Sequence, residues 1–226
     1  MGTTWRLRVL AGVLLLAAGL GCNPLTTVYF MCVGVENKAE PEFKLASNEK
    51  NHEVKVLILA YSAPDVQTDQ VGIDRQVGIE FTRQLDALCK ANKEKVKVIP
   101  FHKVEKFKAD NPGWQMEVAE IGKRFEADYV IDVEIVALNL YKPGSRKTLF
   151  EGAARLEVSA LDLHKPQDGP AWHQVIQVGY PSGAKGAIPV GDDNVDSFRE
   201  MFVRRIATDL CWKFTGHTAN ESYRAD

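Results

Sequence analysis

Two pairs of charged residues are the first candidates for chemistry. Asp132 and Glu134 alternate with apolar residues in one predicted strand, and Arg155 and Glu157 do so in the next. Because side chains two positions apart on a strand share one face, the carboxylates of the first pair lie on the same side of the sheet. Two carboxylates about 5–9 Å apart across a cleft could perform acid–base catalysis. A cross-strand ladder of charges is the simpler interpretation, and we favour it.

The five histidines lack the spacing of metal ligands. The sequence contains no HExxH, no His-x3-His and no Cys-x2-Cys pattern. His164 and His173 flank one predicted turn and could approach each other in a hairpin, but two histidines alone do not make a specific metal site. We therefore expect neither a metal nor another cofactor.

A glycine-rich loop between Gly179 and Gly191 resembles a phosphate loop only superficially. A P-loop needs G-x4-G-K-[ST] between a strand and a helix, and this segment has neither the spacing nor the helix. No Gly-x-Ser-x-Gly nucleophile elbow occurs either. We interpret the loop as flexible, with four residues that could form a binding edge: Ser182, Gly183, Lys185 and Gly186.

The first 22 residues indicate export. Arg6 and Arg8 precede an uncharged run from Val9 to Leu20, which is the layout of a secretory signal and too short to span a bilayer. The following Gly19-Leu20-Gly21-Cys22 resembles the lipobox of bacterial lipoproteins. The resemblance implies a signal peptide over 1–21, a diacylglycerol on the Cys22 thiol and a membrane anchor facing the periplasm. A plain cleaved signal with a free Cys22, or a retained anchor, are the alternatives.

The remaining cysteines allow at most one bridge within the chain. If Cys22 carries lipid, the other thiols are Cys32, Cys89 and Cys211. Cys89 and Cys211 lie near the ends of two predicted helices, so they are the better candidates for a disulfide if those helices lie side by side. A Cα separation above about 7 Å would exclude the bridge.

Length and charge limit the partners. The chain has 226 residues, which is one ordinary domain with an appended segment. Its 28 basic and 30 acidic side chains give a net charge of −2, which disfavours a nucleic-acid surface. A hydrophobic content of 45% is typical of a globular protein with a packed core.

Hydrophobic patterning predicts a tether over 22–53, a mixed α/β domain over 54–216 and a frayed polar tail over 217–226. Phe43 and Leu45 could dock on the domain, and 28–35 could alternatively form an edge strand. We expect strands over 54–60, 96–100, 129–140, 150–163 and 172–180, with helices over 70–91, 114–126 and 192–214 and one or two helical turns over 103–108. The order β-α-β-α-β-β-β-α predicts a single five-stranded mixed sheet with helices packed on it.

The run Glu126-Ala127-Asp128-Tyr129-Val130-Ile131-Asp132-Val133-Glu134 resembles a turn found in one group of envelope proteins. That group includes the amino-terminal domain of the Tol-system periplasmic propeller protein, the curli-secretion lipoproteins and the activator lipoproteins of penicillin-binding proteins. The chain is also similar to uncharacterised lipoproteins of planctomycete-type bacteria, through the lipobox, Ala127-Asp128, Leu140-Tyr141, Leu149-Phe150-Glu151-Gly152 and Phe198-Arg199 to Phe202-Val203-Arg204. These resemblances imply a location and an architecture, not an activity.

We therefore expect a non-enzymatic, lipid-anchored envelope protein that binds another envelope protein or contributes to an assembly of undetermined oligomeric state. By the proteobacterial sorting rule, Asn23 after the cysteine favours the outer membrane. One alternative is a binder of a small ligand or cell-wall fragment at the 179–191 loop, and another is an enzyme with an unrecognised site. Trp114 and Trp172 could anchor a partner, but core packing suits both better because each falls on an apolar stripe. The charge balance predicts no nucleic-acid partner.

Overall fold

The computed structural model describes residues 38–45, 52–111, 117–181, 186–191 and 194–218. The chain divides into two compact units, Met1–Asn37 and Lys38–Asp226, and all described residues belong to the second. Several predictions therefore fall outside the described residues, namely those on the signal, Cys22, Cys32, 28–35, Trp114, Ser182, Gly183, Lys185, Asp192 and Asp193.

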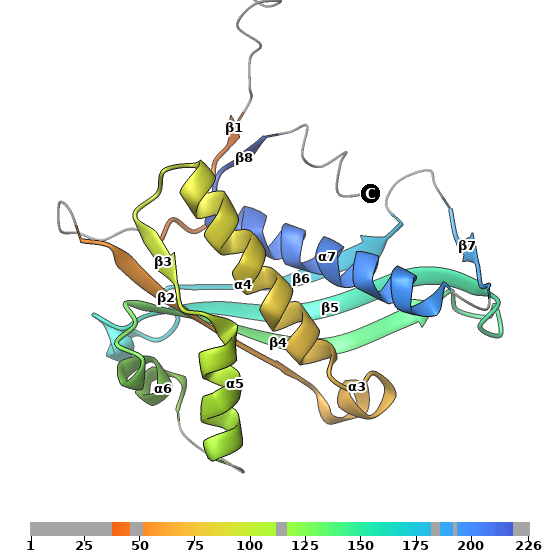
Figure 1. The fold of residues 1–226 in the computed structure, drawn as a ribbon, viewed down its shortest axis with the longest axis horizontal. Coiled ribbons are helices and arrows are strands. Elements are labelled where there is room, and N and C mark those ends of the chain that lie inside the picture. Colours follow the sequence, from red (N-terminus) through yellow and green to blue (C-terminus); the bar gives the residue numbers. More distant parts are fainter. Residues whose placement is uncertain (1–37, 46–51, 112–116, 182–185, 192–193, 219–226) are drawn as a thin grey trace, which may run out of the picture. The chain divides into compact units, whose positions relative to one another are not determined.

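The second unit is built on one mixed sheet (Figure 1). Its strands are β2 (Val54–Ser62), β3 (Val96–Val98), β4 (Tyr129–Tyr141), β5 (Leu149–Asp162), β6 (Trp172–Tyr180) and β7 (Ile188–Pro189). The strand order is β3-β2-β4-β5-β6, and β7 pairs with the far end of β5. The pairs β2–β3 and β2–β4 are parallel, whereas β4–β5 and β5–β6 are antiparallel. The mixed sheet predicted from the element order is confirmed, with β7 as a sixth strand that was not predicted.

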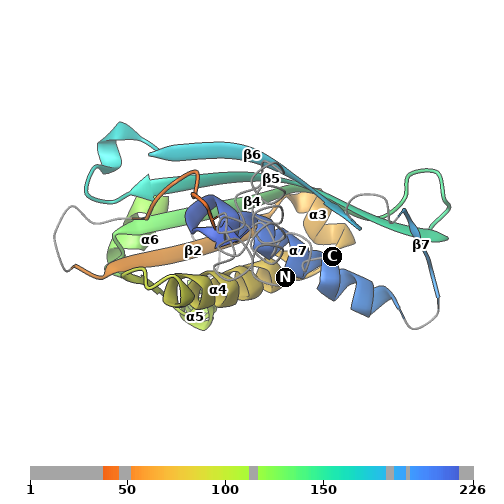
Figure 2. The same cartoon turned by 90° about the horizontal axis from the view of Figure 1, so that it is seen from above.

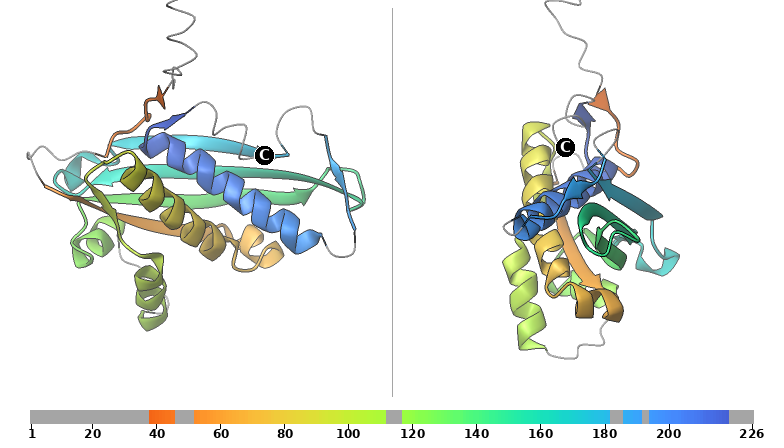
Figure 3. Two further views of the ribbon diagram at one scale, coloured as in Figure 1. Left: turned by 45° about the horizontal axis from the view of Figure 1, so that its top comes forward. Right: turned by 90° about the vertical axis from the view of Figure 1, so that its right-hand side faces the viewer.

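Helices cover both faces of the sheet, and α4 (Ile73–Ala91) and α7 (Val195–Phe214) lie side by side across one of them (Figures 1 and 3). Their apolar faces pack with the inward residues of β2, β4, β5 and β6 into the larger core, which includes Phe81, Phe150, Phe198, Phe202 and Phe214. A smaller core on the opposite face joins α5 (Phe101–Asp110) and α6 (Val118–Arg124) to Leu57, Leu59 and Val130. None of the helices in the described ranges is long and apolar enough to cross a bilayer.

The predicted helix over 70–91 is α4, which starts three residues later, at Ile73. A short helix α3 (Pro64–Asp69), which was not predicted, precedes it. Gly72 separates them because its φ of 72° is left-handed, a conformation that glycine adopts without steric cost. Near the middle of the chain, α5 is a ten-residue helix rather than one or two turns, and α6 begins at Val118.

The domain extends beyond the predicted 54–216. Residues 38–39 (β1) and 217–218 (β8), which the sequence assigned to the tether and the tail, pair as a small antiparallel sheet. Phe43 does dock as predicted, since its ring packs edge-on against Tyr129 and Phe214 with centroids 5.8 and 6.4 Å away. Leu45 is buried beside it. Residues before and after the predicted 54–216 therefore belong to the folded domain, and Phe43 packs against Phe214 at the end of α7.

Candidate functional site

The carboxylate of Asp132 lies in a polar cluster on the sheet face opposite α4 and α7. Asp132 occupies an outward position on β4, where the Tyr61 hydroxyl of β2 donates a hydrogen bond to Oδ2 over 3.1 Å. The other oxygen, Oδ1, is buried and has no hydrogen-bond partner among the described residues. Lys108 of α5 approaches from one side but donates its own hydrogen bond to the Ala60 carbonyl at 2.7 Å.

Burial dominates the electrostatics of this cluster. It raises the pKa of Asp132 to about 6, with a further contribution from the nearby Glu134 carboxylate, while the Tyr61 hydrogen bond and Lys108 oppose the increase. Burial and the Asp132 carboxylate also raise the pKa of the Tyr61 phenol. A carboxyl group with a pKa near 6 can exchange a proton near neutral pH, as acid–base catalysis requires. Neither of the two depressions described below includes Asp132 among its lining residues.

The predicted charge ladder differs from the observed register. Glu134 lies opposite Glu157, and Asp132 lies opposite Ser159. A bulge in β4 between Ile135 and Ala137 brings Arg155 opposite Ala137, away from both carboxylates. Arg155 instead lies 4.0 Å from Glu157 on its own strand. Period-two alternation predicted the shared face correctly, but a bulge cannot be inferred from alternation alone.

Asp128 organises a second polar cluster at the turn that leads into β4. Its carboxylate accepts a hydrogen bond from the Lys55 backbone N–H at 2.7 Å and lies 3.1 Å from His52 Nε2 and 3.2 Å from His164 Nε2. Burial works against ionisation of Asp128, but the Lys55 N–H and the histidines outweigh it and lower its pKa. The backbone N–H of Asp128 also donates to the Lys55 carbonyl at 2.8 Å.

This cluster explains part of the Ala127-Asp128-Tyr129 motif. Asp128 joins the start of β2 to the start of β4, so its role is to align two strands. His164 contacts Asp128. His173 lies on β6 opposite Ser159, and no contact between the two histidines is seen among the described residues. Within the described ranges, no group of three or more metal-ligating side chains is arranged to hold an ion.

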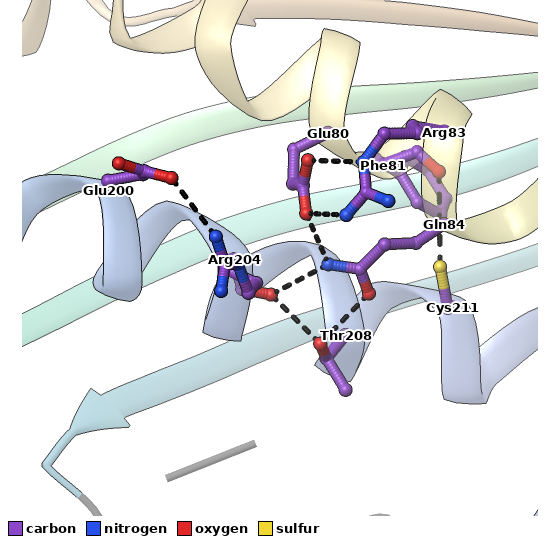
Figure 4. Close-up of polar contacts among 8 residues, drawn as sticks. All are labelled: Glu80, Phe81, Arg83, Gln84, Glu200, Arg204, Thr208 and Cys211. Carbon is purple, nitrogen blue, oxygen red and sulfur yellow. Dashed lines mark hydrogen bonds and ion pairs between the residues drawn. The ribbon is translucent and has the colours of Figure 1, made fainter. Parts of the chain in front are cut away.

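A third feature of the surface is the seam between α4 and α7, which a polar bridge crosses (Figure 4). The Gln84 amide donates to Glu80 at 2.8 Å and to the Arg204 carbonyl at 3.2 Å, and it accepts from the Thr208 hydroxyl at 2.9 Å. Arg83 donates to Glu80 at 2.8 Å, which helps to lower the pKa of that carboxyl despite its burial. Every strong donor in the bridge therefore already has an acceptor within the protein.

The bridge separates two depressions along the seam. The larger, of about 420 Å³, is lined by two apolar residues, Ile79 and Val203, and by polar or charged ones, namely Gln76, Glu80, Asp196, Arg199, Glu200 and Arg204. The smaller, of about 240 Å³, lies toward the ends of the helices and includes Leu88 and Trp212. Ile79 is 46% exposed in this otherwise polar setting. Sequence patterning does not reveal this seam, because Ile79 falls outside the main apolar stripe of α4.

Cys89 and Cys211 are both free, buried thiols, so the predicted disulfide is absent. The helices that carry them do lie side by side, as the prediction required. Cys211 points toward the Phe81 carbonyl, with Sγ 3.9 Å from the oxygen (Figure 4). Burial raises the pKa of both thiols, to about 12 for Cys89. The two residues therefore act as small apolar core residues.

The remaining predicted sites give little geometry. Of the four loop residues proposed as a binding edge, only Gly186 is described, with a left-handed φ of 56°. Trp172 packs edge-on against Phe214 with ring centroids 5.2 Å apart, so the core interpretation is confirmed for this tryptophan.

No protein-family model matches the chain, and no curated protein matches it. Solved structures of similar fold include lipoprotein GNA1162 from Neisseria meningitidis, at 12% identity and a TM-score of 0.41 over 70% of this chain and 97% of that one. Protein XCC0632 from Xanthomonas campestris, of the DUF330 family, is 10% identical with a TM-score of 0.45 over 77% and 85%. An uncharacterised lipoprotein B from Nitrosomonas europaea is 13% identical with a TM-score of 0.34 over 76% and 84%.

Bacterial lipoproteins thus occur among the structural neighbours of this chain. Fold likeness at this level does not transfer a function. The resemblance to Tol-system, curli-secretion and planctomycete-type proteins stays a prediction from the sequence.

Proposed function

We propose that the chain is a non-enzymatic, lipid-anchored protein of the cell envelope that binds another protein through the α4–α7 seam. The lipobox-like sequence at Cys22 supports the anchor, and Asn23 favours the outer membrane with the domain facing the periplasm. The observation that carries the binding role is the exposed Ile79 in a depression where Glu80 pairs with Arg83 and Arg204 pairs with Glu200.

The chemistry of the seam favours a protein over a small ligand. Small-molecule sites enclose their ligand and direct a few unsatisfied polar groups toward it. Here Glu80, Arg83 and Gln84 satisfy one another, and Arg204 contacts Glu200 at 3.0 Å. An apolar contact inside a polar rim is instead the usual organisation of a protein–protein interface. The partner should therefore offer an apolar side chain to Ile79 and polar groups to its surroundings.

A crosslinking experiment in the native membrane tests this role. The full-length chain would carry a photocrosslinker in place of Ile79, and a matched variant would carry it in place of Lys106, which is exposed on α5, on the opposite face of the sheet. We expect one defined protein adduct from position 79 that position 106 does not give. Substitution Gln76→Lys, on the rim, should reduce its yield. Identical adducts from both positions, or none from position 79, would contradict the proposal.

The anchor has its own test. Lipid chains contribute about 0.8 kcal/mol per buried methylene, so two or three of them hold a protein at the membrane. Cys22→Ser should therefore move the protein out of the membrane fraction or leave it unprocessed, whereas Cys89→Ser should not. Unchanged mass and fractionation of the Cys22 variant would contradict lipidation.

Two other functions are less favoured than protein binding, and each has its own test. A small ligand or cell-wall fragment bound at the loop between Gly179 and Gly191 should raise the free energy of unfolding by about 2.7 kcal/mol at 100 times its Kd. A thermal-shift screen of cell-wall fragments would detect this change. An enzymatic function would require turnover that Asp132→Asn or Glu134→Gln abolishes.

A further inference from the structure

The long edge of the main sheet is open in the described structure. β6 is the last strand of the order β3-β2-β4-β5-β6, and Figure 2 shows it along the outer side of the sheet. No described segment pairs with β6 on the side away from β5. Alternate backbone N–H and C=O groups between Trp172 and Gly179 therefore point away from the sheet, as at any edge strand.

The two edges of this sheet are built differently. The opposite edge, β3, has three residues and carries the exposed Lys97. Short length and lysine are two of the usual means by which an edge strand avoids pairing with another chain. β6 has nine residues, Trp-His-Gln-Val-Ile-Gln-Val-Gly-Tyr, and contains no Asp, Glu, Lys or Arg. β6 is therefore the less protected of the two edges.

One side chain of β6 also suits a neighbouring strand. Val175 is 41% exposed, although a β-branched residue at this position is suited to cross-strand packing. The edge therefore offers an apolar contact in addition to its backbone groups.

We infer that β6 is a self-association edge, at which two copies of this chain pair their β6 strands antiparallel into one continuous sheet. An edge of backbone groups requires an extended strand as its occupant. The second copy supplies a strand of the same length, without charge, that is rich in β-branched residues. This inference is independent of the α4–α7 seam, which lies on the helices.

Self-complementarity favours the second copy over a different protein. An isologous pairing centred on Ile176 sets Val175 opposite Gln177 of the second copy and His173 opposite Gly179 of the second copy. On the other side of the strand, Gln174 lies opposite Val178 of the second copy. No like charges meet, and the bulky imidazole faces the residue without a side chain. A twofold axis perpendicular to the sheet leaves α7 of both copies on the same face.

Two double variants test the pairing and its register. In V175K/Q177K, lysines of the two copies lie directly opposite each other, whereas in V175E/Q177K each lysine lies opposite a glutamate of the second copy. Within one chain, residue 175 faces Glu157 and residue 177 faces Arg155, so the intrachain pairs favour V175K/Q177K and cannot cause its loss of association. All substitutions are at exposed positions and leave the core unchanged. Because two cross-strand pairs change from attractive to repulsive, the two variants should differ by about tenfold or more in self-association.

The measurement uses the full-length chain with two different tags, co-expressed, solubilised from the membrane and captured through one tag. Wild type and V175E/Q177K should co-purify the second tag, and V175K/Q177K should lose it although its thermal unfolding midpoint is no lower than that of V175E/Q177K. A wild type that captures no second copy would overturn the inference. So would equal capture by both variants, or equal loss. Because the seam is intact in both variants, photocrosslinking from position 79 reports separately on the proposed function.

Discussion

The hydroxyl of Tyr61 donates a hydrogen bond to Oδ2 of Asp132 over 3.1 Å, joining β2 to β4 on the sheet face opposite α4 and α7. Burial raises the pKa of that carboxyl from an ordinary 3.8 to about 6. Between these two values the folded protein holds a proton that the unfolded chain releases. Stability gained from this group is therefore fully present below about pH 4 and is lost as the pH rises through about 6.

Asp132→Asn should accordingly stabilise the protein at pH 7 and have little effect at pH 4. The asparagine keeps an acceptor for Tyr61 but has no charge to bury, and a shift of about two pKa units corresponds to at most about 3 kcal/mol. Urea unfolding at several pH values measures the difference. Glu151→Gln, at an exposed position of β5, should show no such pH dependence. A pH-independent difference for the Asp132 variant would refute burial as the cause.

Asp128→Ala should destabilise the fold by about 1–3 kcal/mol, because the Lys55 N–H loses its acceptor at the junction of β2 and β4. The lowered pKa of Asp128 adds a pH dependence of the opposite sign. Its contribution is present above the unfolded pKa and is lost as the pH falls through the folded value, below about pH 4.

Chemical denaturation of Asp128→Ala at pH 7 measures the loss in free energy of unfolding. Glu126→Gln is the matched control, since its ion pair with Lys55 is exposed and such pairs contribute about 0–1 kcal/mol. Equal stability of the two variants would show that Asp128 does not align the strands.

Gly78→Ala should destabilise the protein although alanine is the better helix former by about 1 kcal/mol. A Cβ at Gly78 of α4 would lie 2.3 Å from the buried Phe101 ring at the start of α5, and overpacking of this kind costs about 1–3 kcal/mol. Gly191→Ala is the control, because its nearest neighbour would be 3.7 Å away, an ordinary van der Waals distance. Thermal unfolding should separate the two variants by several degrees, and a Gly78 variant as stable as the control would contradict this account.

Cys89 and Cys211 should not react with a thiol reagent in the native protein. Both are fully buried, and burial raises their pKa values, which reduces the reactive thiolate. Mass mapping after labelling should find both unmodified under native conditions and both modified in denaturant without a reductant. Modification in denaturant only after reduction would show that a disulfide had formed between them.

Much of the fold could be predicted because its signals are local. The continuous apolar run from Val54 indicates a strand covered on both faces. The helical spacing of apolar residues indicates α4 and α7, and each of them buries one apolar face. The element order then limits the topology to a mixed sheet. The short helix α3 was not predicted, and α4 starts three residues later than the predicted helix because Gly72 before it has a left-handed conformation.

The sites depended on contacts between distant segments. Asp132 and Glu134 share a face because alternation dictates it, but their partners follow from the β4 bulge and from the position of Tyr61 on β2. His164 meets Asp128, 36 residues earlier in the chain, rather than the closer His173.

By itself, the sequence determined the strands, the principal helices and the shared face of the carboxylates, because periodicity is a property of neighbouring residues. Only the tertiary structure decided that Asp132 is buried, that Cys89 and Cys211 are core thiols, that Ile79 is exposed between two helices and that β6 is an open edge. Burial and strand order depend on which distant segments come together, and no local pattern encodes them.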